Sequence, residues 1–228
     1  MRAPEAYIEW INAHLGFNPR SQANSNALSG FVVADLTQLC RKIAADLKSG
    51  KVVPAKNADV LTKVASRNVD LVLNENKTGV VRVSIEHKTI MTAHAKARWN
   101  RYGDIIAYCN HMHNHRRESI AAATVIINCS PAYENPDAFA RGLLRPRFKM
   151  EKVVADTVKI FAGIPLRAAA QEPNDQPEGL AVIVVDYDGK NPAKLVTGAL
   201  APQPGSPIHY ENFLARLCKL YRQRFAAA

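Results

Sequence analysis

The sequence predicts an α/β protein of three layers, α/β/α, in which helices lie on both sides of a central mixed sheet. Two apolar runs, residues 119–129 and 180–187, are typical of strands that are buried on both faces. Amphipathic helical patterns precede and follow them. The order of strand, helix and strand over residues 81–129 indicates a right-handed crossover within one sheet.

Length and charge restrict the class of protein. A chain of 228 residues is enough for one α/β domain with a full core, so we expect a single domain over 1–228. The net charge of +10 suits a polyanionic partner. Four cysteines lie far apart without a CxxC, which argues against a zinc ribbon and favours a reduced, cytoplasmic setting. No apolar run has the length of a membrane span, so we expect no membrane partner.

The N-terminal part predicts helices joined by a polar loop. Residues 4–15 have proline in the first turn and one apolar face, which favours a helix. Residues 17–30 are rich in Asn and Ser and predict a loop. Residues 35–48 form the clearest helical pattern, with Asp35 as its expected N-cap. Residues 56–67 are interpreted as a further short helix.

A β-hairpin is predicted over residues 68–88. Apolar and polar residues alternate on each side of the segment NENKTG, whose Asn and Gly residues tolerate a tight turn. In the second strand Glu86 and Lys88 share one face, while His87 shares the other with valines and an isoleucine. Because a hairpin returns the end of its second strand to the start of its first, Glu86 can approach Asp70.

Two converging carboxylates repel each other unless a cation lies between them. Their oxygen atoms suit a hard ion, so Mg²⁺ is the expected cofactor, and we expect no small organic cofactor. Lys88 could position or activate a water molecule and offset phosphate charge. Asp70, Glu86 and Lys88 are therefore our candidate catalytic residues for phosphodiester hydrolysis. The alternative is a surface hairpin with an ordinary Glu–Lys ion pair.

The segment from Asp70 through Glu86-His87-Lys88 to the following basic helix resembles the PD-(D/E)xK nucleases, over about residues 67–129. The proline that this family has before its aspartate is Val69 here. The resemblance implies a restriction-endonuclease-like core, with Asp70, Glu86 and the His87 backbone carbonyl as metal ligands and Lys88 as the catalytic lysine. Many members add an acid from an earlier helix. Asp35, Asp46 and Glu9 are available, but a cap explains Asp35 better, and solvated charges explain the other two better.

Basic residues after the hairpin are candidates for DNA contacts. A helix is predicted over residues 92–113, with Trp99 on its apolar side and His94, Arg98 and Arg101 in a basic stripe. This stripe could hold phosphates or be an ordinary solvated face. The densest basic patch follows near residue 145. The candidate DNA-binding residues are His94, Lys96, Arg98, Arg101, Arg145 and Arg147.

The remaining patterns complete the α/β order. Residues 149–161 and 209–225 predict helices, and residues 165–179 predict an exposed loop. The polar segments 18–29 and 167–178 are candidate base-reading loops. His111 and His115 form an i, i+4 pair that could bind a transition metal, but no nearby ligand completes such a site in the sequence. The last alanines, residues 226–228, are interpreted as an appended tail.

These observations predict a Mg²⁺-dependent DNA endonuclease that leaves 5′-phosphate ends, and resemblance and chain size favour a type II restriction enzyme. One hairpin site per chain predicts a homodimer if both strands of double-stranded DNA are cut. One alternative is a repair or recombination nuclease that recognises DNA structure. Another is a nucleic-acid-binding module that lacks catalysis.

Overall fold

The computed structural model describes residues 1–19, 21–134, 141–142 and 150–226. Its centre is one six-stranded mixed sheet whose strands lie in sequence order. The first three strands are antiparallel, the third, fourth and fifth are parallel, and the sixth is antiparallel to the fifth. The strands are β1 (Val52–Leu61), β2 (Ser66–Glu75), β3 (Val81–Ile90), β4 (Ile120–Asn128), β5 (Gly179–Asp186) and β6 (Lys194–Val196).

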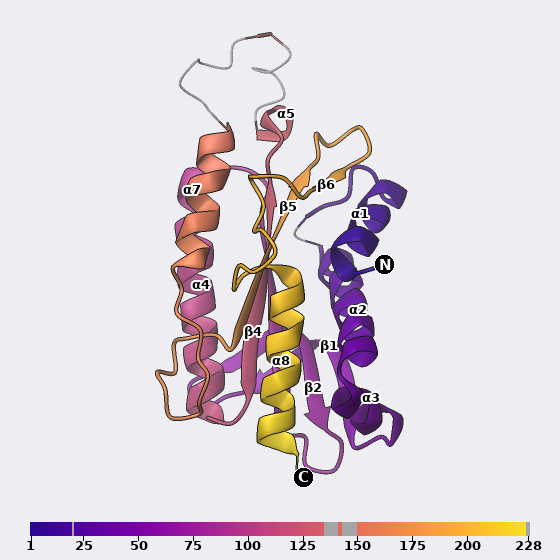
Figure 1. The fold of residues 1–228 in the computed structure, drawn as a ribbon, viewed down its shortest axis with the longest axis vertical. Helices are drawn as coiled ribbons and strands as arrows, with labels where there is room; N and C mark the ends of the chain where they lie inside the picture. Colours follow the sequence, from indigo (N-terminus) through magenta and orange to yellow (C-terminus); the bar gives the residue numbers. More distant parts are fainter. Residues whose placement is uncertain (20, 135–140, 143–149, 227–228) are drawn as a thin grey trace.

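Helices cover both faces of this sheet, which confirms the predicted three-layer α/β class (Figure 1). The long helix α4 (His94–His115) and α7 (Met150–Ala162) pack together on one face. The other face is covered by α1 (Ala3–Ala13), α2 (Gln22–Leu39), α3 (Arg41–Lys48) and α8 (Tyr210–Phe225). A short helix, α5 (Pro131–Glu134), follows β4.

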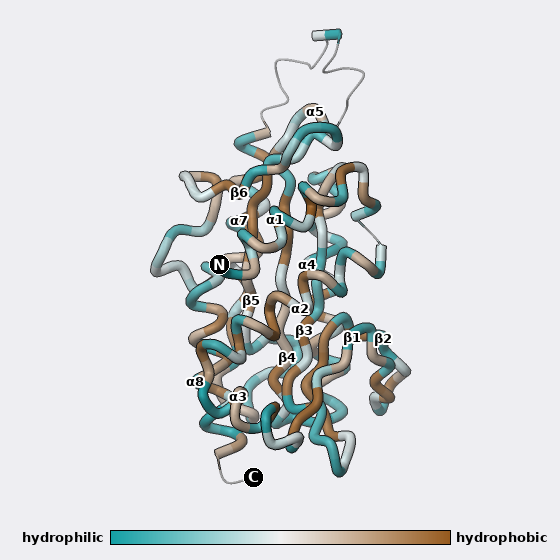
Figure 2. Tube along the Cα trace, turned by 90° about the vertical axis from the view of Figure 1, so that its right-hand side faces the viewer, coloured by the Kyte–Doolittle hydropathy of each residue, from teal (hydrophilic) through white to brown (hydrophobic). Residues whose placement is uncertain are grey.

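The sheet separates two apolar clusters. Every residue of β4 is buried, and so is β5 except for its last residue, as their continuous apolar sequences predict. Leu71 and Ile85 face α2 and α8, whereas Val69 and Val125 face α4 and α7. Figure 2 shows these hydrophobic strands inside the molecule, between more hydrophilic helices and turns. None of the described helices is long and apolar enough to cross a membrane.

The helices before the hairpin differ from the prediction. The polar segment that we expected to be a loop forms the first half of α2, capped by the Ser21 side chain. Leu28 and Leu36 anchor this helix in the core, so packing overrides the loop-like composition. The predicted single helix over residues 35–48 is wrong, because the extended backbone of Cys40 separates α2 from α3.

Residues 56–67 were expected to be helical, and this prediction is also wrong. They belong to β1, its turn and the start of β2. The register pairs Val53 with Asn74 and Val60 with Arg67, so β2 supplies the hydrogen bonds of this edge strand. Its residues alternate poorly in hydrophobicity, and strand pairing rather than local pattern decides the conformation. Leu61 and Val64 are exposed at the tip of the β1–β2 hairpin.

A buried ionic cluster holds the segment before β5. The Glu178 carboxylate is fully buried and accepts hydrogen bonds of 2.8 Å from Arg167 Nη1, Arg224 Nη1, His113 Nε2 and the Ala121 N–H. Burial raises the pKa of Glu178, but its cationic partners outweigh this effect and the net pKa is lowered. Arg167 and Glu178 therefore lie inside the protein, and the candidate reading loop between them is tied down at both ends.

Candidate active site

The candidate site lies where β2 and β3 separate. Their described pairing runs from Asn74 and Val81 to Leu71 and Ile85, one residue short of Asp70 and Glu86. At Asp70 the carboxylate enters the gap, and its Oδ2 accepts a hydrogen bond of 2.7 Å from the His87 backbone N–H. β3 continues beyond this point because β4 pairs with it in parallel as far as Ile90. The hairpin thus presents acidic side chains at its open end, as the sequence predicts.

Glu86 and Lys88 are neighbours on β3. Lys88 Nζ lies 2.5 Å from Glu86 Oε1, and the two side chains are 19% and 14% exposed. The second carboxylate oxygen, Oε2, is buried and has no hydrogen-bond partner among the described residues. Burial raises the pKa of Glu86; the Lys88 ammonium opposes this effect, and the Asp70 carboxylate adds to it. The two acids are therefore close enough to repel each other, as predicted.

These residues fit a hard divalent cation. Asp70 and Glu86 offer only oxygen atoms, and Oε2 of Glu86 is buried without a hydrogen-bond partner among the described residues. Within the described residues, no group of three or more histidine, cysteine or acidic side chains is arranged to hold a metal. Mg²⁺ typically uses one or two carboxylates and retains several waters, and its binding here stays a prediction. The His87 carbonyl as a further ligand stays a prediction.

The acids upstream of the hairpin serve other purposes. Asp35 Oδ2 accepts hydrogen bonds from the Ala3 N–H (2.7 Å) and the Tyr210 hydroxyl (2.9 Å), so it caps α1 rather than its own helix. Asp46, expected to be solvated, is buried and lies 2.6 Å from Lys42 Nζ. On the α2 side the site is bordered by Ser25 and other uncharged residues rather than by an acid.

The His87 imidazole is a component of the site that the sequence analysis missed. Ser29 Oγ donates to the Asp70 carbonyl oxygen at 3.1 Å, so at its 3.0 Å contact with His87 Nε2 it must accept. His87 Nδ1 then accepts from Thr124 Oγ1 at 2.8 Å. The ring is neutral and protonated at Nε2, and burial lowers its pKa to about 4. A polar residue on an otherwise apolar strand face was the available signal.

The predicted basic stripe on α4 is only partly present. His94 is buried, with Nε2 2.7 Å from the Asn128 carbonyl oxygen, and so does not belong to an exposed basic face. Lys96 is exposed, and Arg98 lies over Trp99, which is 55% exposed instead of packing in the core as expected. Arg101 points toward the site side, where its Nε donates to the Thr89 carbonyl oxygen at 3.3 Å.

A groove runs past these residues. One hollow of about 370 Å³ contains Asp70, His87 and Lys88, and a second of about 390 Å³ contains Met91 and Tyr133. Both are bordered by Pro19, Thr89 and Arg101, so they adjoin at the end of β3. The candidate contacts Arg145 and Arg147 lie outside the described residues.

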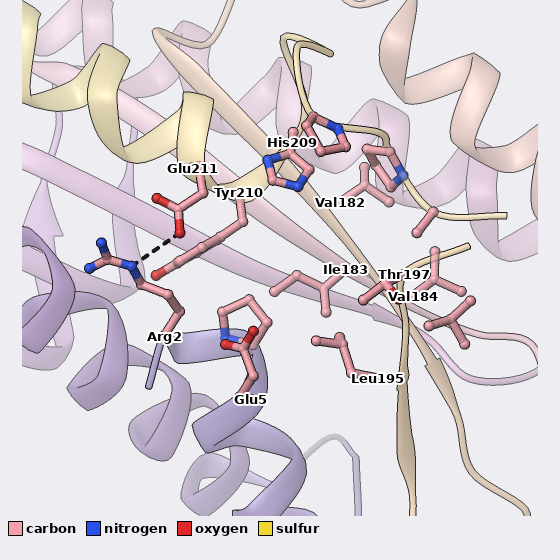
Figure 3. Close-up of a pocket in the computed structure, with 15 residues that line it drawn as sticks. Arg2, Glu5, Val182, Ile183, Val184, Leu195, Thr197, His209, Tyr210 and Glu211 are labelled. Atoms are coloured by element: carbon pink, nitrogen blue, oxygen red, sulfur yellow. Dashed lines mark hydrogen bonds and ion pairs between the residues drawn. The ribbon is translucent and has the colours of Figure 1, made fainter. Parts of the chain in front are cut away.

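Another hollow, of about 270 Å³, lies at the opposite edge of the sheet. Figure 3 shows its apolar floor, formed by Ile183, Leu195 and their neighbours, beneath charged side chains from α1 and α8. Arg2 on its rim is paired with Glu211, with Nε and Oε1 3.0 Å apart. This hollow contains none of the three candidate catalytic residues, so we do not assign the chemistry to it.

Comparison with known proteins finds no matching family model, no matching curated protein and no matching solved structure.

Proposed function

We propose that this protein is a Mg²⁺-dependent nuclease that hydrolyses phosphodiester bonds of DNA to leave 5′-phosphate ends. The observation that carries the proposal is that Glu86 pairs with Lys88 and is repelled by the Asp70 carboxylate where β2 and β3 separate, with one Glu86 oxygen buried and unpartnered among the described residues. In an ordinary surface Glu–Lys pair, both carboxylate oxygens would be exposed to water or hydrogen-bonded, and neither would be buried without a partner.

Each residue has a role that follows from its position. Asp70 and Glu86 would hold the ion, which when bound would polarise the phosphodiester and favour deprotonation of water. The His87 N–H orients the Asp70 carboxylate through its 2.7 Å hydrogen bond. Lys88 shields Glu86 in the structure and can turn toward the phosphate to offset its negative charge or position the attacking water.

The finer proposal is a type II restriction enzyme that acts as a homodimer on double-stranded DNA. The described part of the chain carries one such site, so a double-strand cut by this site needs two copies placed across the duplex. A second candidate is a nuclease that recognises DNA structure, and the hollow beside Lys88, which is lined by uncharged polar side chains, favours it. Sequencing the cut ends separates these candidates, because only a restriction enzyme cuts at one fixed sequence.

Plasmid cleavage tests the proposal. Wild-type protein with Mg²⁺ should cut, whereas Glu86→Ala with Mg²⁺ and wild type with Ca²⁺ should not. Glu9→Ala, at an exposed glutamate on α1, is the matched control and should cut normally. Discrete fragments support the restriction enzyme, and a smear supports the structure-directed nuclease. Cleavage that persists in Glu86→Ala would reject the assigned site, and DNA binding without any cleavage would reject the catalytic proposal.

A further inference from the structure

The groove has two chemically different halves. The half that contains Asp70 is bordered on its far side by uncharged amide and hydroxyl groups, including Gln22, Ser25, Asn57 and Asn68. Such groups offer both hydrogen-bond donors and acceptors, which suits the polar edge of a nucleobase rather than a phosphate. The cationic groups of this hollow, Lys88 and Arg101, would meet the backbone instead.

We call this border of amide and hydroxyl groups, which includes Gln22, Ser25, Asn57 and Asn68, the amide wall. An unusual backbone conformation holds part of it in place. Asn57 lies between Lys56, which pairs with Leu71, and Ala58, which pairs with Val69, and its φ of +48° is in the left-handed region. Its side chain donates to Asn26 Oδ1 on α2, and Asn68 Nδ2 donates to its carbonyl oxygen at 3.1 Å. Left-handed residues within a strand persist only where their surroundings hold them, and they concentrate at functional sites. The wall is thus formed before any ligand arrives.

The other half of the groove offers an aromatic ring. Tyr133 is half-buried beside Met91, and its ring lies against that of Tyr187, with centroids 5.6 Å apart. Tyr187 in turn stacks on Phe17, with centroids 5.7 Å apart. This support fixes the Tyr133 ring at the border of the hollow. Ring faces of this kind bind unpaired bases by stacking, with little dependence on sequence.

Arg101 lies between the halves, since it borders both hollows. Its hydrogen bonds to the Thr89 carbonyl oxygen (3.3 Å) and to Asp104 Oδ2 (2.8 Å) limit the movement of the guanidinium. A cation between a base-edge wall and a stacking ring is placed to contact the phosphate that joins two successive nucleotides.

We propose that the groove binds one unpaired DNA strand, with one base against the amide wall, a neighbouring base on Tyr133 and a phosphate near Arg101. This inference rests on the proposed nuclease function and names its substrate as single-stranded or locally opened DNA, which favours the structure-directed nuclease over the restriction enzyme. Each hollow, of about 370 and 390 Å³, has the size of a site for one small organic molecule. A paired duplex hides its base faces in the stack and its Watson–Crick edges in the base pairs, so it cannot place them in such hollows.

Fluorescence anisotropy in Ca²⁺ tests the inference without cleavage. The probes are a fully paired labelled duplex, the same duplex with a central unpaired bubble, and the single strand. We expect wild type to bind the bubble and the single strand roughly tenfold more tightly than the duplex, as loss of one base-stacking contact would imply. Equal affinity for all three probes would overturn the inference.

Variants on both halves make the test specific. The double substitution Gln22→Ala, Asn68→Ala changes two exposed residues, and Tyr133→Ala removes the ring. Each should abolish the preference for unpaired DNA and leave duplex affinity unchanged. Tyr133→Phe, which keeps the ring, and Gln223→Ala, at an exposed glutamine on α8, should keep the preference. A preference that survives both the double variant and Tyr133→Ala would reject the assigned groove.

The outcomes separate this inference from the proposed function. Plasmid cleavage that depends on Glu86, with no preference for unpaired DNA, rejects the inference alone. Tight binding of unpaired DNA through the groove, with no cleavage of any probe in Mg²⁺, rejects the nuclease and retains the groove. Failure to bind any of the three DNA probes rejects both.

Discussion

Acid should destabilise this protein through His87. Burial of the imidazole lowers its pKa from the ordinary 6.5 to about 4. Between these two pH values the unfolded chain binds more protons than the folded chain, so the free energy of unfolding decreases as the pH falls. With 1.36 kcal/mol for each pH unit, the fall from 6.5 to about 4 corresponds to at most about 3 kcal/mol.

The hydrogen bonds explain the direction of this effect. His87 Nδ1 accepts a hydrogen bond from Thr124 Oγ1 at 2.8 Å, and a proton on Nδ1 would remove that acceptor. The stabilisation is therefore fully present above the ordinary histidine pKa and is lost as the pH falls through about 4. Because the same residue donates its backbone N–H to Asp70, protonation would also disturb the candidate site.

Equilibrium denaturant unfolding at neutral pH and near pH 4 measures the effect. His87→Asn keeps an acceptor near Thr124 but does not titrate. We expect it to be about 1 kcal/mol less stable than wild type at neutral pH, because the Ser29 contact is lost. Between neutral pH and about pH 4, the free energy of unfolding of His87→Asn should fall by about 2–3 kcal/mol less than that of wild type. His115→Asn, at an exposed position, serves as the control. An equal loss of stability in wild type and His87→Asn would refute the reasoning.

Three further predictions concern the interior and the candidate site. Glu178→Gln should destabilise the fold by about 3–5 kcal/mol in denaturant unfolding, because it leaves the buried Arg167 without a counter-charge. Glu118→Gln, at an exposed ion pair, should cost under about 1 kcal/mol. Gly179→Ala should lower stability by about 1–3 kcal/mol, because its Cβ would lie 2.9 Å from a core leucine. Gly103→Ala, in the open middle of α4, should raise stability by about 0.5–1 kcal/mol. Equal effects of the two substitutions would contradict this prediction. Mg²⁺ affinity, measured by calorimetry, should weaken as the pH falls, and the weakening should begin above the ordinary glutamate pKa of 4.5, because the raised pKa of Glu86 favours its protonated form. Glu86→Gln should bind Mg²⁺ weakly at every pH.

Much of the fold could be predicted because its patterns are local. The β2–β3 turn, the buried strands β4 and β5 and the amphipathic helices α7 and α8 were predicted within a few residues of their bounds. Strand alternation alone placed Glu86 beside Lys88, and hairpin geometry alone brought Glu86 near Asp70. These relations follow from the two-residue period of a strand and the return of the chain at a turn, so they need no knowledge of distant segments.

Other features depend on segments far apart in the sequence. β1 is a strand because β2 supplies its hydrogen-bond partners, and the first half of α2 is a helix because the core receives Leu28. Asp35 contacts α1 and α8, so its own helix gives no sign of its role.

Tertiary structure also decided the surroundings of the candidate site. The charge state of His87 depends on Ser29 from α2 and Thr124 from β4, which lie 58 and 37 residues away in the sequence. The groove likewise joins an amide wall on α2, β1 and β2 to Tyr133 after β4. The sequence by itself determined which acids and which lysine share the hairpin, because strand geometry is local. Enclosure, which sets pKa values and the shape of a binding surface, arises only when distant elements pack together.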